Sequence, residues 1–231
     1  RVLLGESLMS VPLFDFQERI SETDPRRFYP ALGKRLFDLA VILFMAPVVL
    51  PLMLCIFLSV ALSGGRPLFS QMRIGRDGRV FRCWKFRTMI PDADAALVRI
   101  LREDSDLAEE WRRTQKLRLD PRITRFGRIL RKTSLDELPQ LWNVLCGTMS
   151  LVGPRPFLPG QKNLYLGGRR DADYYRMLPG ITGLWQVSRR NKGSFAERAT
   201  YDADYRNMLG FWADVSILVR TVFVVMRASG V

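Results

Sequence analysis

The chain has 231 residues, of which 48% are hydrophobic and 26% are charged, a composition typical of a folded protein. Its formal net charge of +13 predicts an anionic partner: nucleic acid, an anionic membrane surface or a phosphorylated substrate. The sequence contains no histidine, which excludes Ser-His-Asp and Cys-His catalytic systems and HExxH zinc sites. Its three cysteines, Cys55, Cys83 and Cys146, are too widely spaced to indicate a disulfide framework or a metal site, and they favour a reducing, cytosol-facing environment.

The first part of the chain reads as a peripheral arm followed by a membrane element. Residues 1–30 are predicted to be an N-terminal arm or linker. The run from Leu39 to Leu62 carries no charge and is long enough to cross a bilayer, which takes about 20 residues. Pro47 and Pro51 interrupt it, and basic residues flank it on both sides.

Because Lys and Arg prefer the cytoplasmic side of a membrane, two basic flanks favour a segment that enters and leaves on the same face. Residues 31–65 therefore fit a re-entrant helix-break-helix and an ordinary kinked spanning helix equally well at this point.

Residues 66–231 are predicted to form a small α/β, helix-rich domain at the membrane surface. Turn signals at Gly75 and Asp77-Gly78 predict a β-hairpin within residues 66–90. Residues 91–117 and 136–146 have helical patterns, and a loop rich in proline and glycine follows at 147–160. The apolar stretch at 211–227 suits a helix that lies either on the core or in the membrane interface.

Two groups of basic residues and one single arginine are candidates for binding phosphate. Arginines recur every third residue from Arg122 to Arg131, so on a helix they would partly share one side, either as a phosphate site or as a solvated basic face. Lys85 and Arg87 stand two residues apart and would share one face of a strand. Arg155 lies in a rigid Gly-Pro-Arg-Pro loop.

The pair Asp136-Glu137 is the strongest catalytic candidate. Asp136 could cap a helix that has Pro139 at its third position, and Ser134 with Glu137 could form a capping box. The same place also suits chemistry, because an ionised carboxylate among arginines can attack phosphorus or hold Mg²⁺. Three Asp-Ala-Asp segments match a pattern of metal-dependent glycosyltransferases, but three matches in one chain make that signal weak: Asp92–Asp94, Asp171–Asp173 and Asp202–Asp204.

From about residue 34 to its C-terminus the chain resembles the bacterial sugar transferases, the monotopic polyprenyl-phosphate phosphoglycosyl transferases. Several long motifs carry the resemblance in order: KRLFD, FRCWKFRTM, DPRITRFGRILRKTSLDELPQLWNV, SLVGPRP, LPGITGLWQVS and DADYRN.

The resemblance implies transfer of a sugar 1-phosphate from a UDP-sugar to undecaprenyl phosphate, with release of UMP. Asp136 would be the nucleophile on the β-phosphate, and Glu137 would position or deprotonate the acceptor. Mg²⁺ would bind near this pair. The phosphate-binding residues of the family fall on Arg131, Arg155, Lys85 and Arg87. The re-entrant helix would break at Pro47.

The same resemblance implies a bacterial inner membrane location with the active site on the cytoplasmic face, a role in exopolysaccharide assembly, and contact with anionic lipids. Nucleic acid is not expected as a partner, and a homo-oligomer is possible. Two departures from the family pattern stand at Thr148, where many members have Asp, and at Arg189-Arg190, where many have Gly-Arg. The alternative function is a metal-dependent glycosyltransferase that would release UDP.

Overall fold

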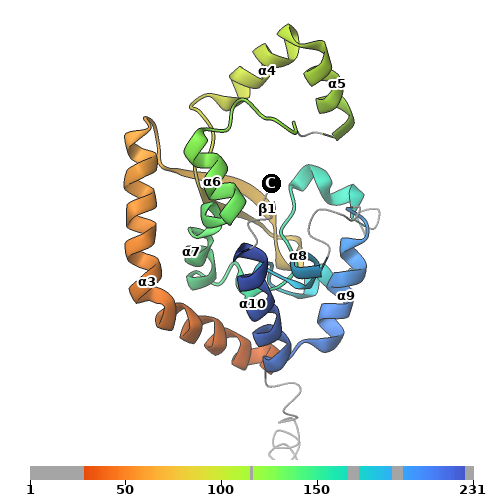
Figure 1. Cartoon of the computed structure of the whole chain (residues 1–231). Helices are drawn as coiled ribbons and strands as arrows, with labels where there is room; N and C mark the ends of the chain where they lie inside the picture. The colour runs from red at the N-terminus through yellow and green to blue at the C-terminus, as the bar shows by residue number, and fades with distance from the viewer. Residues whose placement is uncertain (1–28, 115–116, 166–171, 189–194, 227–231) are drawn as a thin grey trace, which may run out of the picture.

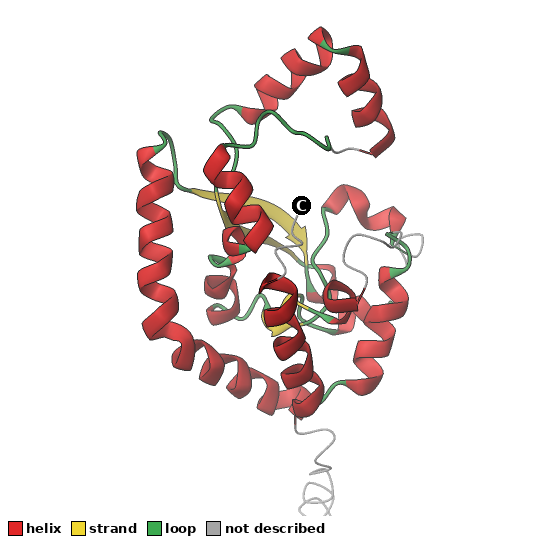
Figure 2. Ribbon diagram, viewed as in Figure 1, coloured by secondary structure: helices red, strands yellow, loops and turns green. Residues whose placement is uncertain are grey.

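The computed structural model describes residues 29–114, 117–165, 172–188 and 195–226. Figure 2 shows a helix-rich molecule whose few strands are short. The long helix α3 runs along one side, α9 lies on the opposite side, and the β1–β2 hairpin crosses between them (Figure 1). The described helices are α3 (Lys34–Leu62), α4 (Ala93–Glu103), α5 (Ser105–Thr114), α6 (Arg125–Thr133), α7 (Gln140–Leu145), α8 (Leu184–Ser188), α9 (Arg198–Met208) and α10 (Phe211–Met226).

The predicted hairpin is confirmed by an antiparallel pair, β1 (Leu68–Ile74) and β2 (Val80–Phe86). The turn between the strands contains Asp77 and Gly78, both with positive φ, of 58° and 73°. Glycine adopts this region without steric cost and aspartate tolerates it better than most residues, so the turn signals in the sequence had a direct conformational cause.

The segment predicted to be a helix-break-helix forms one long helix, α3. A short π-helical turn (Tyr29–Gly33) leads into α3, which continues from Lys34 to Leu62 with Pro47 and Pro51 inside it. Figure 1 shows a pronounced bend in this helix. The helix is continuous through Pro47: each proline removes one helical hydrogen bond and crowds the preceding turn, which bends the helix without ending it. The re-entrant course of this segment stays a prediction.

The surface of α3 is largely apolar and largely uncovered. By length and composition it is able to cross a membrane. Along most of its length the large side chains are exposed, among them Leu43, Phe44, Val48 and Leu62. A contiguous exposed apolar surface of this kind indicates contact with lipid or with another protein.

The helical pattern at 91–117 is confirmed by α4 and α5, which stand beyond the rest of the molecule at the top of Figure 1. Arg122 connects them to the main body. Its guanidinium lies 5.4 Å from the centre of the Trp111 ring, and it forms a buried pair with Asp120 at 2.7 Å.

The segment that contains Asp136 and Glu137 differs from the helix caps predicted for it from the sequence. Helix α6 begins after Thr124, whose side-chain oxygen accepts a hydrogen bond from Gly127 N, and it ends at Ser134, with a φ of 58°. A 3₁₀ turn (Leu135–Glu137) follows, and Pro139 directly precedes α7. The prediction that Asp136 caps a helix with Pro139 at its third position is therefore wrong. Asp136 lies inside the 3₁₀ turn, and Pro139 lies between that turn and α7.

A second strand pair lies within the expected loops. β3 (Ser150–Val152) runs parallel to β4 (Gly180–Thr182). Both strands have only three residues, too few for the alternation of apolar and polar residues that identifies a strand in a sequence. Gly153 follows β3 in close contact with the backbone: an added Cβ would lie 2.4 Å from the Leu178 carbonyl oxygen. This close packing fixes the start of the loop that carries Arg155.

The first turns of α3 are attached to the domain core through buried polar groups. Asp214, fully buried, accepts hydrogen bonds from Lys34 Nζ at 2.5 Å and from Tyr205 Oη at 2.6 Å. Asp38, also buried, accepts from Ser150 Oγ at 2.7 Å and from Leu151 N at 3.2 Å. Helix α3 is thus joined to α10, α9 and β3 by hydrogen bonds of buried polar side chains, which would be costly to bury without partners.

We expect Asn143 to be a main stabilising link between α7 and β2. Its Oδ1 accepts from Trp84 N at 3.0 Å, and its Nδ2 donates to the Arg82 carbonyl at 2.7 Å. Asn143→Leu would leave both backbone groups without these partners and should lower the free energy of unfolding by about 2 kcal/mol. Thermal unfolding in detergent measures the loss. Asn207→Leu, the same change at an exposed position of α9, is the matched control and should change the melting temperature little.

Asp202 makes stability depend on pH. It accepts from Tyr165 Oη at 2.6 Å, and burial raises its pKa to about 7. Between about pH 4 and pH 7 the folded chain retains a proton that the unfolded chain has lost, so stability falls as pH rises through this window, by at most about 4 kcal/mol. Asp202→Asn should remove most of this fall. Parallel melting curves from pH 5 to pH 8 for both proteins would contradict the assignment.

Candidate active site

The acidic pair occupies a short turn that the fold holds on several sides. Asp136 and Glu137 lie in the 3₁₀ turn between α6 and α7, in contact with β2. The Asp136 residue is only 7% exposed, so its carboxylate does not lie on an open surface. A buried acidic pair of this kind requires cationic partners to stay charged.

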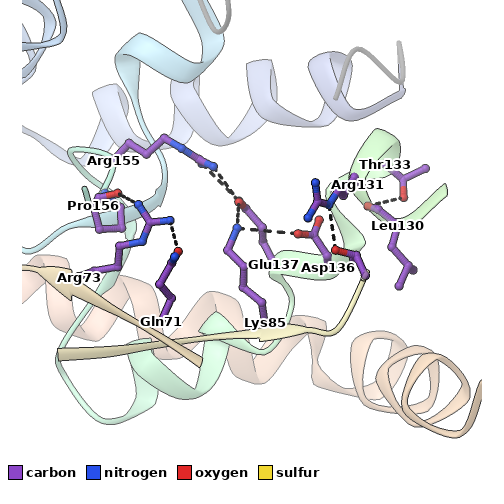
Figure 3. Close-up of polar contacts among 11 residues, drawn as sticks. Gln71, Arg73, Lys85, Leu130, Arg131, Thr133, Asp136, Glu137, Arg155 and Pro156 are labelled. Carbon is purple, nitrogen blue, oxygen red and sulfur yellow. Dashed lines mark hydrogen bonds and ion pairs between the residues drawn. The ribbon is translucent and has the colours of Figure 1, made fainter. Parts of the chain in front are cut away.

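Glu137 receives those partners from two distant segments (Figure 3). Lys85, from β2, donates from Nζ to Oε1 at 2.8 Å. Arg155, from the loop after β3, donates from Nη2 to the same oxygen at 2.9 Å. Lys85 Nζ also lies 3.8 Å from Asp136 Oδ2. Four of the residues predicted from the sequence therefore meet in one cluster.

The two carboxyl groups have different protonation preferences. Burial raises the pKa of Asp136, an effect that Lys85 opposes and the charge of Glu137 reinforces. Burial also pushes the pKa of Glu137 upward, but the charges of Arg155 and Lys85 and their hydrogen bonds outweigh it and hold that pKa well below its usual range. Such divergence between neighbouring groups is typical of sites where two carboxyls have different roles.

Only one arginine of the predicted stripe reaches this region. Arg131, in the last turn of α6, donates from Nε to Thr88 Oγ1 at 2.8 Å and lies near enough to Asp136 for that carboxylate to offset part of the burial that lowers the pKa of Arg131. Arg125 and Arg128 are exposed, and Arg122 is engaged with Asp120. Two of the four arginines of the stripe therefore form a solvated face, and the other two are engaged within the fold.

The structure separates Arg87 from Lys85. Strand β2 ends at Phe86, so the alternation that would place Lys85 and Arg87 on one face stops before Arg87. The Arg87 guanidinium instead donates from Nη2 to the Val60 carbonyl at 3.1 Å and to Ser63 Oγ at 3.0 Å. Arg87 therefore satisfies the C-terminal end of α3, which favours a positive charge.

Arg73 belongs to the site, although sequence reasoning missed it. A small pocket is lined by Arg73, Lys85, Glu137 and Arg155 together with Cys83, Gln140 and Pro156. Arg73 donates to the Pro156 carbonyl at 3.2 Å and to Gln71 Oε1 at 2.6 Å (Figure 3). Burial lowers the pKa of Arg73, and the nearby charge of Arg155 lowers it further. The spacing of Gln71 and Arg73 on one face of a predicted strand was the only signal in the sequence.

The acidic side chains of the site could hold Mg²⁺ only if substrate phosphates and water supplied its other ligands. The described residues contain no group of three or more Cys, Asp or Glu side chains placed to hold a metal. Mg²⁺ in phosphate-transfer sites typically takes one or two carboxylates and completes its shell with phosphate oxygens and water. Asp136 and Glu137 meet that requirement, whereas none of the described residues of the Asp-Ala-Asp segments belongs to such a group of three.

The two departures from the family pattern fall in different places. Thr148 Oγ1 donates to the Asn143 carbonyl at 3.1 Å, so it supports the turn after α7 and is not among the residues around the acidic pair. Arg189 and Arg190, like Asp171 and nearly all of the predicted N-terminal arm, lie outside the described residues.

Comparison with known proteins agrees with these motifs. Residues 29–228 match the family model described as "Bacterial sugar transferase". The chain is 46% identical over 198 residues to the UDP-galactose-lipid carrier transferase of Erwinia amylovora, covering 85% of this chain and 41% of that protein. It is 43% identical over 198 residues to the undecaprenyl-phosphate galactose phosphotransferase of Salmonella typhimurium, with the same shares of 85% and 41%.

The exopolysaccharide production protein ExoY of Rhizobium meliloti is 41% identical over 210 residues, which cover 90% of this chain and 92% of that protein. The chain thus spans about two fifths of the first two relatives and nearly all of the third. The match over residues 29–228 and the identity to these relatives show that the chain belongs to the bacterial sugar transferase family.

Proposed function

We propose that this chain transfers a sugar 1-phosphate from a UDP-sugar to undecaprenyl phosphate and releases UMP, in exopolysaccharide or related glycoconjugate assembly. The observation that carries the proposal is the buried pair Asp136-Glu137, set among Lys85, Arg155, Arg131 and Arg73. Phosphoryl transfer depends mainly on neutralising charge and positioning the reacting groups, and this cluster supplies both without a histidine. The names of the relatives support the acceptor and the reaction class.

The first step is attack by Asp136 on the β-phosphorus of the donor. A bond forms between a carboxylate oxygen and phosphorus, and the bond from that phosphorus to the oxygen bridging it to the α-phosphate breaks. The electron pair leaves with UMP, and the sugar phosphate remains on Asp136 as an acyl phosphate. Lys85 stands 3.8 Å from Asp136 Oδ2, where its charge favours the ionised form that attacks.

The second step regenerates Asp136. An oxygen of undecaprenyl phosphate attacks the same phosphorus, the bond to Asp136 breaks, and the sugar leaves on a polyprenyl diphosphate. Glu137 is already paired with Lys85 and Arg155, so its role is to hold these two cations around the phosphates and to orient the acceptor through them. A carboxylate whose pKa is held so low is a weak base, which favours positioning over deprotonation.

Asp136 and Glu137 are the residues that would hold Mg²⁺. When bound, the ion would neutralise phosphate charge and orient the donor. Its remaining ligands would come from substrate phosphates and water, which agrees with the two protein carboxylates present.

The membrane placement proposed here follows from the exposed apolar surfaces. α3 would enter the bilayer as a bent, re-entrant helix, with both ends on the cytoplasmic face of the bacterial inner membrane. Exposed Trp142 and Leu145 on α7, and Trp212 and Phe223 on α10, would lie in the interface, where aromatic side chains are favoured. This arrangement brings a soluble donor and a lipid acceptor to one site, with anionic lipids compensating the net charge of +13.

Asp136→Asn tests the reaction. In detergent with Mg²⁺, undecaprenyl phosphate and a panel of UDP-sugars, the wild-type chain should release UMP with at least one donor. Asp136→Asn should reduce the release to background, because an amide cannot form the acyl phosphate, while its thermal melting stays near that of the wild type. Detection of the nucleotide by chromatography also separates the alternatives, since release of UDP would indicate a glycosyltransferase. A folded Asp136→Asn protein with near-normal turnover would exclude this nucleophile.

Glu137→Gln tests the positioning role. The change keeps the shape of the side chain but removes the charge that holds Lys85 and Arg155, so turnover should fall by about a hundredfold, as when a charged hydrogen-bonded partner is lost. Steady-state UMP release measures it. Glu109→Gln, at an exposed helical position, is the matched control and should retain full activity. Retained activity in Glu137→Gln would contradict the role.

A further inference from the structure

A third guanidinium, besides those of Arg73 and Arg155, belongs to Arg198 and is stacked on the rings of Trp185 and Phe195. Arg198, at the start of α9, is partly buried, and burial lowers its pKa to about 10, with further lowering by the charges of Arg155 and Arg73. The charge of Asp202 opposes this lowering in part. Arg73 and Arg155 line the same small pocket beside Glu137. Cations are held together in a protein interior where an anion binds among them.

Stacking fixes the position of Arg198. Its guanidinium carbon lies 4.2 Å from the centre of the Trp185 ring and 4.4 Å from that of Phe195. Phe195 in turn packs edge-on against Phe157, with ring centres 5.9 Å apart. Phe157 comes two residues after Arg155, so the segment that pairs with Glu137 also carries the ring against which Phe195 packs. Arginine stacked in this way keeps its hydrogen-bonding edge free for a planar anionic group.

Buried polar atoms without partners lie on α8 and at the start of α9, two helices that pack against each other. Among the described residues, Trp185 Nε1, Gln186 Oε1 and Arg198 Nε have no hydrogen-bond partner in the chain. The Trp185 and Gln186 residues are only 6% and 8% exposed. Each such atom costs about 1–3 kcal/mol, so three together, two donors and one acceptor, indicate that something else completes their hydrogen bonds.

We propose that Arg73, Arg198, Trp185 and Gln186 form the subsite for the nucleoside monophosphate part of the donor, the part that leaves as UMP. The α-phosphate lies among the guanidinium groups, and the polar edge of the nucleoside meets Trp185 and Gln186. The inference rests on the proposed function for the identity of the nucleotide. It divides the site at Arg155: the sugar phosphate reacts at Asp136, and the leaving nucleotide is held toward Arg198.

The chemistry of the subsite favours a nucleotide over the lipid phosphate. Trp185 Nε1 and Arg198 Nε supply N–H donors, and Gln186 Oε1 supplies an acceptor, which together complement the carbonyl and imide N–H groups of uracil. α9 also lies on the opposite side of the molecule from the exposed C-terminal half of α3 (Figure 1). A soluble, polar ligand suits that position better than a polyprenyl chain does.

Binding of UMP, uridine and inorganic phosphate to the purified full chain in detergent, measured by titration calorimetry, tests the proposal. The wild-type chain should bind UMP more tightly than uridine or phosphate. Arg198→Gln should weaken UMP binding about tenfold or more and uridine binding by a smaller factor, because it removes a charged partner of the phosphate as well as one donor to the nucleoside. Trp185→Phe keeps an aromatic ring but loses the N–H, so it should weaken UMP and uridine by similar factors.

Arg206→Gln is the matched control. Arg206 also lies on α9, but it pairs with Asp173 at 2.8 Å. This variant should bind UMP within twofold of the wild type. A second test uses the wild-type chain and a modified ligand. N3-methyl-UMP lacks the imide N–H that would donate to Gln186 Oε1, so it should bind about tenfold more weakly than UMP. UMP affinity unchanged in both Arg198→Gln and Trp185→Phe, or equal binding of UMP and N3-methyl-UMP, would overturn the proposal.

These measurements are independent of turnover. A chain that binds UMP with the expected variant pattern but transfers no sugar phosphate would retain the subsite and refute the proposed function. Conversely, normal UMP release by Arg198→Gln and Trp185→Phe at an unchanged donor KM would retain the function and refute the subsite.

Discussion

The ion pairs of Glu137 are the constraint on which the rest of the site depends. One carboxylate oxygen accepts from Lys85 at 2.8 Å and from Arg155 at 2.9 Å. The first cation comes from the hairpin and the second from the loop after β3. A carboxylate buried without these partners would be strongly unfavourable, so the turn, the hairpin and the loop must come together for any of the three to be stable there.

Because Glu137 takes up both cations, Asp136 is left less well paired. Its contact with Lys85 is longer, at 3.8 Å, and burial raises its pKa, whereas that of Glu137 is depressed. A carboxylate that is weakly paired is a better nucleophile than one engaged in two short hydrogen bonds. The asymmetry of the pair supports the roles proposed above, with Asp136 available to react and Glu137 fixed as the organiser.

How well each feature of the fold and the site could be predicted depends on how far apart in the sequence its interacting residues lie. The hairpin, the helices at 91–117 and 211–227 and the acidic pair came from local signals: turn residues, periodicity and a contiguous motif. Arg73 and the β3–β4 pair were not predictable, because each depends on segments tens of residues away and neither has a distinctive local pattern. Lys85 and Arg87 show where local signals stop being sufficient. Their spacing would place them on one face of a strand, but the strand ends between them, at Phe86.

The buried polar contacts at the start of α3 extend the same argument from the site to the membrane. Asp38 accepts from Ser150 Oγ and Leu151 N, and Leu151 stands four residues before Arg155 on a segment that Gly153 packs tightly. The N-terminal turns of the apolar helix are thus attached to the strand that positions the Arg155 loop. If α3 is held in the bilayer, this connection fixes the height of the site above the membrane, which a reaction between a soluble nucleotide and a lipid phosphate requires. Asp38 of the KRLFD motif and Ser150 of the SLVGPRP motif, which take no part in the proposed reaction, acquire a physical reason in that attachment.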